Sequence, residues 1–156
     1  MPKITTDYPI VGVKTQVCED ILRALPEWFG IEDAIHHYVQ SAHELPTIFA
    51  YSDGHIAGFL TLKQHSPASS EIYVMGVYPQ YHRQGIGKIM VERAEAFLRE
   101  KSVQFLQVKT LSASHPDKFY ARTRRFYESV GFHHLEEFPT LWGESNPCLL
   151  LIKSLT

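Results

Sequence analysis

In several segments of this chain, apolar side chains recur at a spacing that predicts helices. From Ile31 to Ala42 the apolar residues lie three or four positions apart, with charged residues and histidines between them. That spacing is typical of one face of an α-helix. The same period appears over 18–25, 86–98 and 119–130. The pattern therefore predicts four helices.

The segments between these helices are rich in β-branched and aromatic residues, which favours strands. Two such runs, 47–52 and 55–64, are joined by Asp53-Gly54. This pair is typical of a hairpin turn, because glycine adopts positive φ at no steric cost. Further strands are expected over four more ranges: 71–77, 105–111, 132–138 and 148–155.

The predicted order is therefore α-α-β-β-β-α-β-α-β-β. An antiparallel meander that feeds a β-α-β unit indicates an α/β (α+β) fold with a mixed sheet and helices on its faces. No repeat or linker divides the sequence, so residues 1–156 are expected to form a single domain.

Composition narrows the possible partners. The net charge is −2, with 44% hydrophobic and 21% charged residues. This net charge argues against a duplex-binding surface spread over the whole molecule, though not against a local basic patch, and we expect no nucleic acid as partner. The apolar runs are too short to cross a bilayer, and the N-terminus lacks the apolar segment of a secretion signal. We therefore expect a cytoplasmic protein with no membrane partner. Cys18 and Cys148 have no metal-type spacing and no basic neighbour, so we interpret both as free thiols.

Two glycines, Gly85 and Gly87, lie one residue apart in the stretch VYPQYHRQGIGKIM (77–90), where the third helix begins. A loop between a strand and a helix start presents unpaired backbone N–H groups, and Arg83 and Lys88 would add positive charge. The stretch lacks the spacing of a P-loop and the third glycine of a dinucleotide fingerprint. Taken alone, it fits a phosphate site and a plain helix entry equally well.

This stretch, followed across one β-α-β unit by RFYESVGF (125–132), resembles the GNAT superfamily of acyl-CoA-dependent N-acetyltransferases. The resemblance covers essentially the whole chain, and it implies acetyl-CoA as the cosubstrate with no metal. The strand 71–77 would splay from its neighbour and bind the pantetheine arm through the backbone of Met75 and Val77. The pyrophosphate would be held by the backbone N–H groups of the loop, namely those of Arg83, Gln84, Gly85, Ile86, Gly87 and Lys88.

Two positions depart from the pattern of the family. The family often has Gln or Arg where this chain has His82, and Asn where it has Tyr120. Because the main phosphate donors are backbone groups, the site itself is still expected. The roles of these two side chains are left open.

Acetyl transfer to an amine needs a base for the amine and a proton for the departing thiolate. Tyr127 matches the tyrosine that protonates the CoA sulfur in the family; the alternative is a ring packed in the core. Glu71 lies where some members carry a general base; the alternative is an exposed carboxylate at a strand start. Strand alternation would place Glu71 on the same face as Tyr73 and Met75. A backbone N–H near Met75 or Gly76 would stabilise the developing oxyanion.

Aromatic residues mark the two loops where the family commonly builds its acceptor pocket. Trp28 and Phe29 lie between the first two helices, and Trp142 lies with Glu144 in the last hairpin loop. Aromatic rings beside carboxylates suit a cationic amine. Alternatively, the two tryptophans only cover the core beneath long loops.

Three polar clusters are interpreted as surface features. His36-His37 and His133-His134 are adjacent pairs whose side chains diverge by about 100° on a helix and about 180° on a strand, so no metal site is expected. The basic run on the last helix fits a solvated face; the alternative is contact with the 3′-phosphate of CoA or with a nucleic acid. The run comprises Lys118, Arg122, Arg124 and Arg125.

The sequence therefore predicts an acetyl-CoA-dependent N-acetyltransferase that transfers an acetyl group directly to a primary amine of a small molecule in a ternary complex. Acetylation of protein N-termini or lysines is an alternative, and so is a non-catalytic acyl-CoA-binding module. Edge strands make a homodimer compatible with the predicted fold.

Overall fold

The computed structural model describes residues 1–156 and contains one seven-stranded sheet and four helices. The helices are α1 (Thr15–Arg23), α2 (Glu32–Glu44), α3 (Ile86–Glu100) and α4 (Lys118–Ser129). The strands are β1 (Ile4–Thr6), β2 (Thr47–Ser52), β3 (His55–Gln64), β4 (Ser69–Val77), β5 (Phe105–Leu111), β6 (His133–Phe138) and β7 (Cys148–Ser154). A single 3-10 turn, η1 (Pro79–Tyr81), precedes α3. Every predicted helix and strand is present.

The sheet has the strand order β1-β2-β3-β4-β5-β7-β6. Only β4 and β5 are parallel, and α3 connects them; all other neighbours are antiparallel. The predicted mixed sheet is therefore confirmed. The predicted order was wrong in lacking β1, because three residues are too short to show an alternating pattern.

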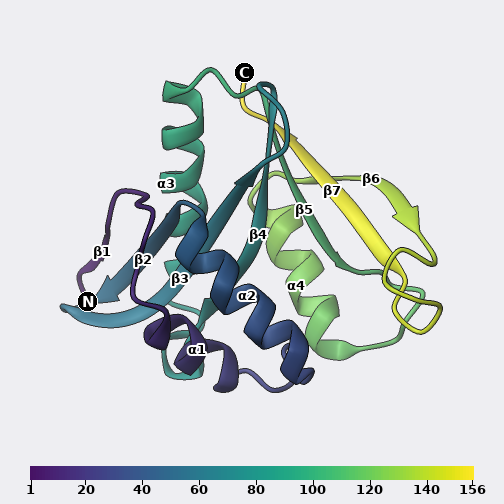
Figure 1. Cartoon of the computed structure of the whole chain (residues 1–156), viewed down its shortest axis with the longest axis horizontal. Helices are drawn as coiled ribbons and strands as arrows, with labels where there is room; N and C mark the ends of the chain where they lie inside the picture. The colour runs from purple at the N-terminus through teal and green to yellow at the C-terminus, as the bar shows by residue number, and fades with distance from the viewer.

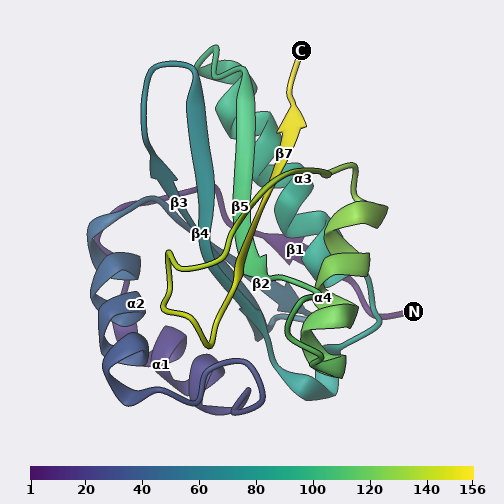
Figure 2. The same ribbon diagram turned by 90° about the vertical axis from the view of Figure 1, so that its right-hand side faces the viewer.

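Helices cover both faces of the sheet, with α1 and α2 on one side and α3 and α4 on the other (Figure 2). Each layer has its own apolar core. Met90 and Leu98 belong to the core beneath α3 and α4, and Ile21 and Phe59 belong to the core beneath α1 and α2. None of the helices combines the length and the apolar character needed to cross a membrane.

The hairpin between β2 and β3 forms at the predicted dipeptide. Asp53 and Gly54 have φ angles of 49° and 82°. Both values are positive, as in a type I′ turn, whose twist matches that of the flanking strands. The turn starts the meander that leads into β4.

The strands β4 and β5 part halfway along their length. Their pairing runs from Ser69 opposite Phe105 to Ile72 opposite Val108 and then ends, although both strands continue. In Figure 1 the two strands diverge toward the lower edge of the view, with α4 behind the gap. The splaying implied by the resemblance is thereby confirmed. We call this divergence the fork.

A β-bulge at Tyr73 changes the alternation along β4. The register between β3 and β4 shifts at this point, so Tyr73 has no partner on β3. Tyr73 contacts His37 of α2, whereas Met75 packs against the core beneath α3. The prediction that Glu71, Tyr73 and Met75 share a face is therefore wrong for Met75, because the extra residue reverses the alternation.

Candidate active site

The loop between β4 and α3 presents a run of unpaired backbone donors. No backbone N–H from residue 83 to residue 88 donates to a carbonyl, and the first such bond joins the Ile89 N–H to the Gly85 carbonyl at 3.1 Å. The helix start adds partial positive charge to these donors. The side chains of Arg83 and Lys88 are exposed, whereas Ile86 is buried and offers only its N–H. This set of groups fits a pyrophosphate.

The two glycines of this loop are each required by the fold itself. Gly85 has a φ of 79°, which glycine adopts readily and other residues do not. A Cβ on Gly87 would lie 3.0 Å from Cζ of Phe126 on α4. Gly87 therefore allows α3 and α4 to approach closely. Ligand access remains a second, predicted reason for both glycines.

The backbone of β4 offers further donors and acceptors inside the fork. The Tyr78 N–H donates to the Ala57 carbonyl at 2.9 Å, which fixes the alternation of hydrogen bonds with β3. By that alternation, Met75 and Val77 direct their N–H and C=O groups away from β3, toward the gap. The Val77 carbonyl accepts a hydrogen bond from His82 Nε2 at 2.8 Å. His82 therefore anchors the loop of residues 83–88 to the end of β4.

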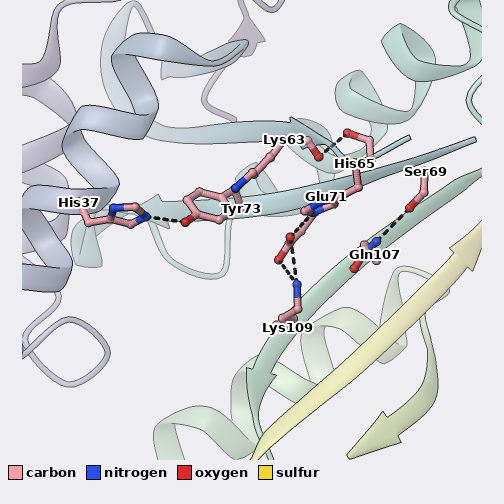
Figure 3. Close-up of polar contacts among 9 residues, drawn as sticks. His37, Lys63, His65, Ser69, Glu71, Tyr73, Gln107 and Lys109 are labelled. Carbon is pink, nitrogen blue, oxygen red and sulfur yellow. Dashed lines mark hydrogen bonds and ion pairs between the residues drawn. The ribbon is translucent and has the colours of Figure 1, made fainter. Parts of the chain in front are cut away.

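Glu71 lies at the closed end of the fork, on the face of the sheet that carries Tyr73 (Figure 3). It is only 4% exposed. Its two carboxylate oxygens lie 3.1 and 3.2 Å from Lys109 Nζ, and Oε1 lies 2.6 Å from His65 Nε2. Because an ionised carboxylate only accepts hydrogen bonds, both neighbours act as donors. Glu71 is therefore a buried, ion-paired group and not an exposed carboxylate.

Tyr127 is carried by α4 and is 6% exposed. Its ring packs edge-on against Phe126 and Phe132, with centroid distances of 5.3 and 5.5 Å. Burial raises the pKa of Tyr127, and the charges of Tyr120 and Glu71 raise the pKa further. The hydroxyl is therefore protonated at neutral pH. Tyr127 belongs to the core beneath α3 and α4, whereas Glu71 lies on the face of the sheet toward α2.

A row of polar and aromatic side chains leads from α2 to the closed end of the fork (Figure 3). His37 Nε2 lies 2.6 Å from the Tyr73 hydroxyl, and the Tyr38 and Tyr73 rings are 5.8 Å apart. Lys63 Nζ lies 4.9 Å from the centroid of the Tyr73 ring. We call His37, Tyr73, Lys63, Glu71 and Lys109 the acceptor row, because they line the face on which the amine is expected.

Trp28 ties the loop between α1 and α2 to α4. Its Nε1 donates to Thr123 Oγ1 at 3.0 Å, and its carbonyl accepts from the Tyr120 hydroxyl at 2.9 Å. Its ring also meets Phe119 and His82 edge-on. Tyr120, a departure from the pattern of the family, thus has a role in fixing this loop. Trp28 therefore fixes the loop between α1 and α2 against α4. It also lies where a wall of the acceptor pocket was predicted.

The other two predicted acceptor residues take no part in these contacts of Trp28. Phe29 packs edge-on against Tyr38, at a centroid distance of 5.9 Å. Trp142 lies in the loop between β6 and β7 and is 42% exposed. Figure 2 shows this loop on the side of the sheet that carries α1 and α2. The structure places Phe29 beside the acceptor row and leaves Trp142 at the surface.

Two interpretations of single residues are wrong. Cys148 does have a basic neighbour, Lys109, which lowers its pKa; burial has the larger effect and raises the pKa to about 11, so the thiol stays protonated. Arg124 is only partly exposed, because it donates to the Leu111 carbonyl at the end of β5, at 2.6 Å. Neither fact could be read from local sequence, since both contacts join separate elements.

The paired histidines lie near carboxylates. His36 Nε2 lies 3.2 Å from Glu32, and His134 Nε2 lies 3.3 Å from Glu128. No three His, Cys, Asp or Glu side chains are arranged to hold a metal ion.

Comparison with known proteins identifies the family. A model of the acetyltransferase (GNAT) family matches residues 15–132. The chain belongs to the GNAT acetyltransferase family. A GNAT-family acetyltransferase from Desulfovibrio desulfuricans has the same fold, with a TM-score of 0.80 and 16% identity over 99% of this chain and 100% of that one.

Two curated relatives of this GNAT protein share parts of its sequence. A mycothiol acetyltransferase of Salinispora arenicola is 42% identical over 52 residues, which are 31% of this chain and 17% of the relative. An uncharacterized N-acetyltransferase of Chlorobaculum tepidum is 26% identical over 98 residues, which are 61% and 56% of the two chains. The chain thus spans between 17% and 56% of the length of these relatives.

Three site residues of this GNAT protein were missed by the sequence analysis: Lys63, Lys109 and His65. Lys109 interrupts the otherwise largely apolar run FLQVKTL, and a charge within such a strand indicates a buried partner. His65 follows β3 and shows no pattern of its own. Lys109 and His65 contact Glu71 only because the register of β4 with its two neighbouring strands brings them together.

Proposed function

We propose that this GNAT protein is an acetyl-CoA-dependent N-acetyltransferase that transfers an acetyl group directly to a primary amine of a small molecule in a ternary complex. The observation that carries the proposal is the fork, with the unpaired donors of residues 83–88 at its open end and with Glu71 at its closed end. A GNAT acetyltransferase from Elizabethkingia anophelis, solved with acetyl-CoA bound, shares the fold (TM-score 0.74, 18% identity, 97% of each chain). This neighbour supports acetyl-CoA as the cosubstrate.

Each residue of the site would have a separate task. Glu71 would accept the proton of the attacking amine, directly or through a water molecule. As the amine nitrogen bonds to the thioester carbon and the C–S bond breaks, Tyr127 would donate its proton to the leaving sulfur. Of the two candidate oxyanion donors, the Met75 N–H is favoured, because the alternation along β4 turns the Gly76 N–H toward β3.

Direct transfer is favoured over a covalent acyl-enzyme. A cysteine nucleophile reacts as its thiolate, which requires a lowered pKa. Burial instead raises the pKa of Cys18 to about 12 and that of Cys148 to about 11. Both thiols would therefore remain protonated and unreactive at neutral pH.

A small-molecule acceptor is favoured over a protein. One neighbour of this fold is an aminoglycoside 6′-N-acetyltransferase complexed with coenzyme A, with a TM-score of 0.73 and 18% identity over 99% of this chain and 97% of that one. Another is the ribosomal-protein-S18-alanine N-acetyltransferase of Escherichia coli, with a TM-score of 0.71 and 17% identity over 100% of this chain and 95% of that one. Fold alone therefore does not separate the two classes. The brace formed by Trp28, Tyr120 and Thr123 fixes one wall of the acceptor side against α4, which suits a walled pocket better than an open groove.

The experiment that tests the proposal measures free CoA thiol released from acetyl-CoA in the presence of single amines and peptides. Amine-dependent release above the hydrolysis rate, with the acetylated amine found by mass spectrometry, is the expected result. Turnover of peptides alone would favour the protein acetyltransferase. Acetyl-CoA binding without turnover of any amine or peptide would favour the non-catalytic module.

We also propose a location and an assembly state. We place the protein in the cytoplasm without a nucleic-acid partner, in line with its net charge of −2. A homodimer is compatible with the edge strand β6, which is exposed along most of its length. Light scattering of the purified chain would test it.

A further inference from the structure

The charges of the acceptor row are unequally paired. Glu71 is the carboxylate of the row, and it is already engaged by Lys109 and His65. Lys63 on β3 lies directly opposite Glu71 in the strand register, yet it makes no ion pair. Its ammonium lies instead against the Tyr73 ring, at 4.9 Å from the centroid. The row therefore contains one cation that no carboxylate of the chain neutralises.

We propose that Lys63 binds an anionic group of the acceptor, so that the preferred substrates are amines that carry a carboxylate. This inference rests on the proposed function, because it names the class of amine that the site accepts. It assigns to Lys63 the recognition of the substrate and no part in the chemical step.

The position of Lys63 favours such an interaction. Its side chain is half-buried, and an aromatic face replaces part of the water around the ammonium. The supporting ring is itself fixed, since His37 bonds the Tyr73 hydroxyl at 2.6 Å. A carboxylate that reaches Lys63 would form a charge-assisted hydrogen bond with a group that is already oriented.

The same charges disfavour amines with several positive groups. Specificity arises from unfavourable contacts as well as from favourable ones. A second ammonium on the substrate would find Glu71 already paired with Lys109 and would meet the unpaired charge of Lys63. A polycationic acceptor would therefore gain little on this face.

The test compares amines of equal length that end in a carboxylate or in a carboxamide: glycine, β-alanine and 4-aminobutyrate against their amides. Rates are expressed per neutral amine, because the two end groups change amine ionisation differently. We expect the best carboxylate to exceed its amide in kcat/KM by about tenfold or more, which corresponds to about 1.4 kcal/mol. The ratio should fall to near one in Lys63→Met and largely persist in Lys63→Arg.

A matched control is available just after the end of α3. Lys101 Nζ also lies 4.9 Å from the centroid of an aromatic ring, that of Phe97, but outside the acceptor row. Lys101→Met should leave the preference for carboxylates unchanged. The inference is overturned if the wild-type protein prefers the amides or a diamine such as cadaverine, or if Lys63→Met keeps the carboxylate preference.

A binding measurement separates this inference from the proposed function. Calorimetry of the CoA-loaded protein with each amino acid and its amide reports recognition without turnover. Binding of the carboxylate that depends on Lys63, without acetylation of any amine, would support the inference and contradict the proposed reaction. Acetylation of amines with no effect of Lys63 on either measurement would contradict the inference alone.

Discussion

Lys109 on β5 holds both carboxylate oxygens of Glu71 on β4, at 3.1 and 3.2 Å, at the point where these two strands stop pairing. The ion pair replaces the backbone hydrogen bonds that end there and closes the narrow end of the fork. Because Glu71 is buried, the loss of one partner is expected to cost more than the pair contributes as a whole.

Lys109→Met should therefore destabilise the protein by roughly 3 kcal/mol, since it leaves a buried carboxylate without its cation. Urea unfolding measures the change. The double variant with Glu71→Gln should recover much of the loss, because no charge is then left unpaired. Equal stability of Lys109→Met and the wild-type protein would show that solvent, and not Lys109, stabilises the carboxylate.

Glu71→Gln should lower turnover, because glutamine cannot accept the proton of the amine. We expect a loss of kcat of about 10²-fold or more, a typical value for a general base. The KM for acetyl-CoA should change little. A variant that keeps its turnover would show that another group acts as the base.

Tyr127→Phe should lower kcat by about 10²–10⁴-fold, since it removes the proton donor for the leaving sulfur. The ring stays in the core, so binding of acetyl-CoA, measured by calorimetry, should be unchanged. Tyr120→Phe is the matched control on the same helix face. It removes one hydrogen bond to Trp28, at a cost of about 1 kcal/mol in stability, and should retain most of the turnover.

Gly85→Ala should weaken acetyl-CoA binding, because it forces a side chain into a backbone conformation with a φ of 79° beside the unpaired N–H groups. Gly54→Ala is a close control, with a φ of 82° and no atom within 4 Å of the added Cβ. Both variants should lose about 1–2 kcal/mol of stability from the left-handed conformation. Equal acetyl-CoA affinity in both would argue against a ligand at the loop.

Stability should fall in alkaline solution because of the buried thiols. Burial raises the pKa of Cys18 to about 12 and that of Cys148 to about 11. In the unfolded chain both thiols would deprotonate near pH 8.5–9, so above this pH the unfolded state binds fewer protons than the folded state. The free energy of unfolding therefore decreases as the pH rises from about 9 through the folded-state pKa values. Urea midpoints between pH 7 and 10.5 measure this slope. Cys18→Ala should show a shallower slope, and an equal slope would assign the effect to other groups.

Local patterns were sufficient to predict most of the fold. The hairpin at Asp53-Gly54 and the strands 47–52, 55–64 and 105–111 were predicted with their observed bounds. Turn chemistry and side-chain periodicity act over a few residues and are therefore visible in the sequence. The short strand β1 was missed, because it is defined by its pairing with β2 and not by its own pattern.

The site was only partly predictable for the same reason. The loop of residues 83–88 and Tyr127 lie within compact motifs, whereas the ion pair of Glu71 with Lys109 joins residues 38 positions apart. The bulge at Tyr73 shows no glycine or proline that would mark it, yet it decides which side chains of β4 face α2.

The sequence by itself determined every element except β1, the order of those elements and the loop that would bind a phosphate, because these depend on contacts between near neighbours. The tertiary structure decided how far β4 and β5 stay together, which partners neutralise Glu71 and which cation is left unpaired beside it. These properties arise from strand register and from side chains that meet across the sheet, and no local pattern encodes them. Lys63 is the clearest case. In the sequence it is an ordinary lysine in a strand, but in the structure Glu71 opposite it is already paired with Lys109, so Lys63 is left without a carboxylate.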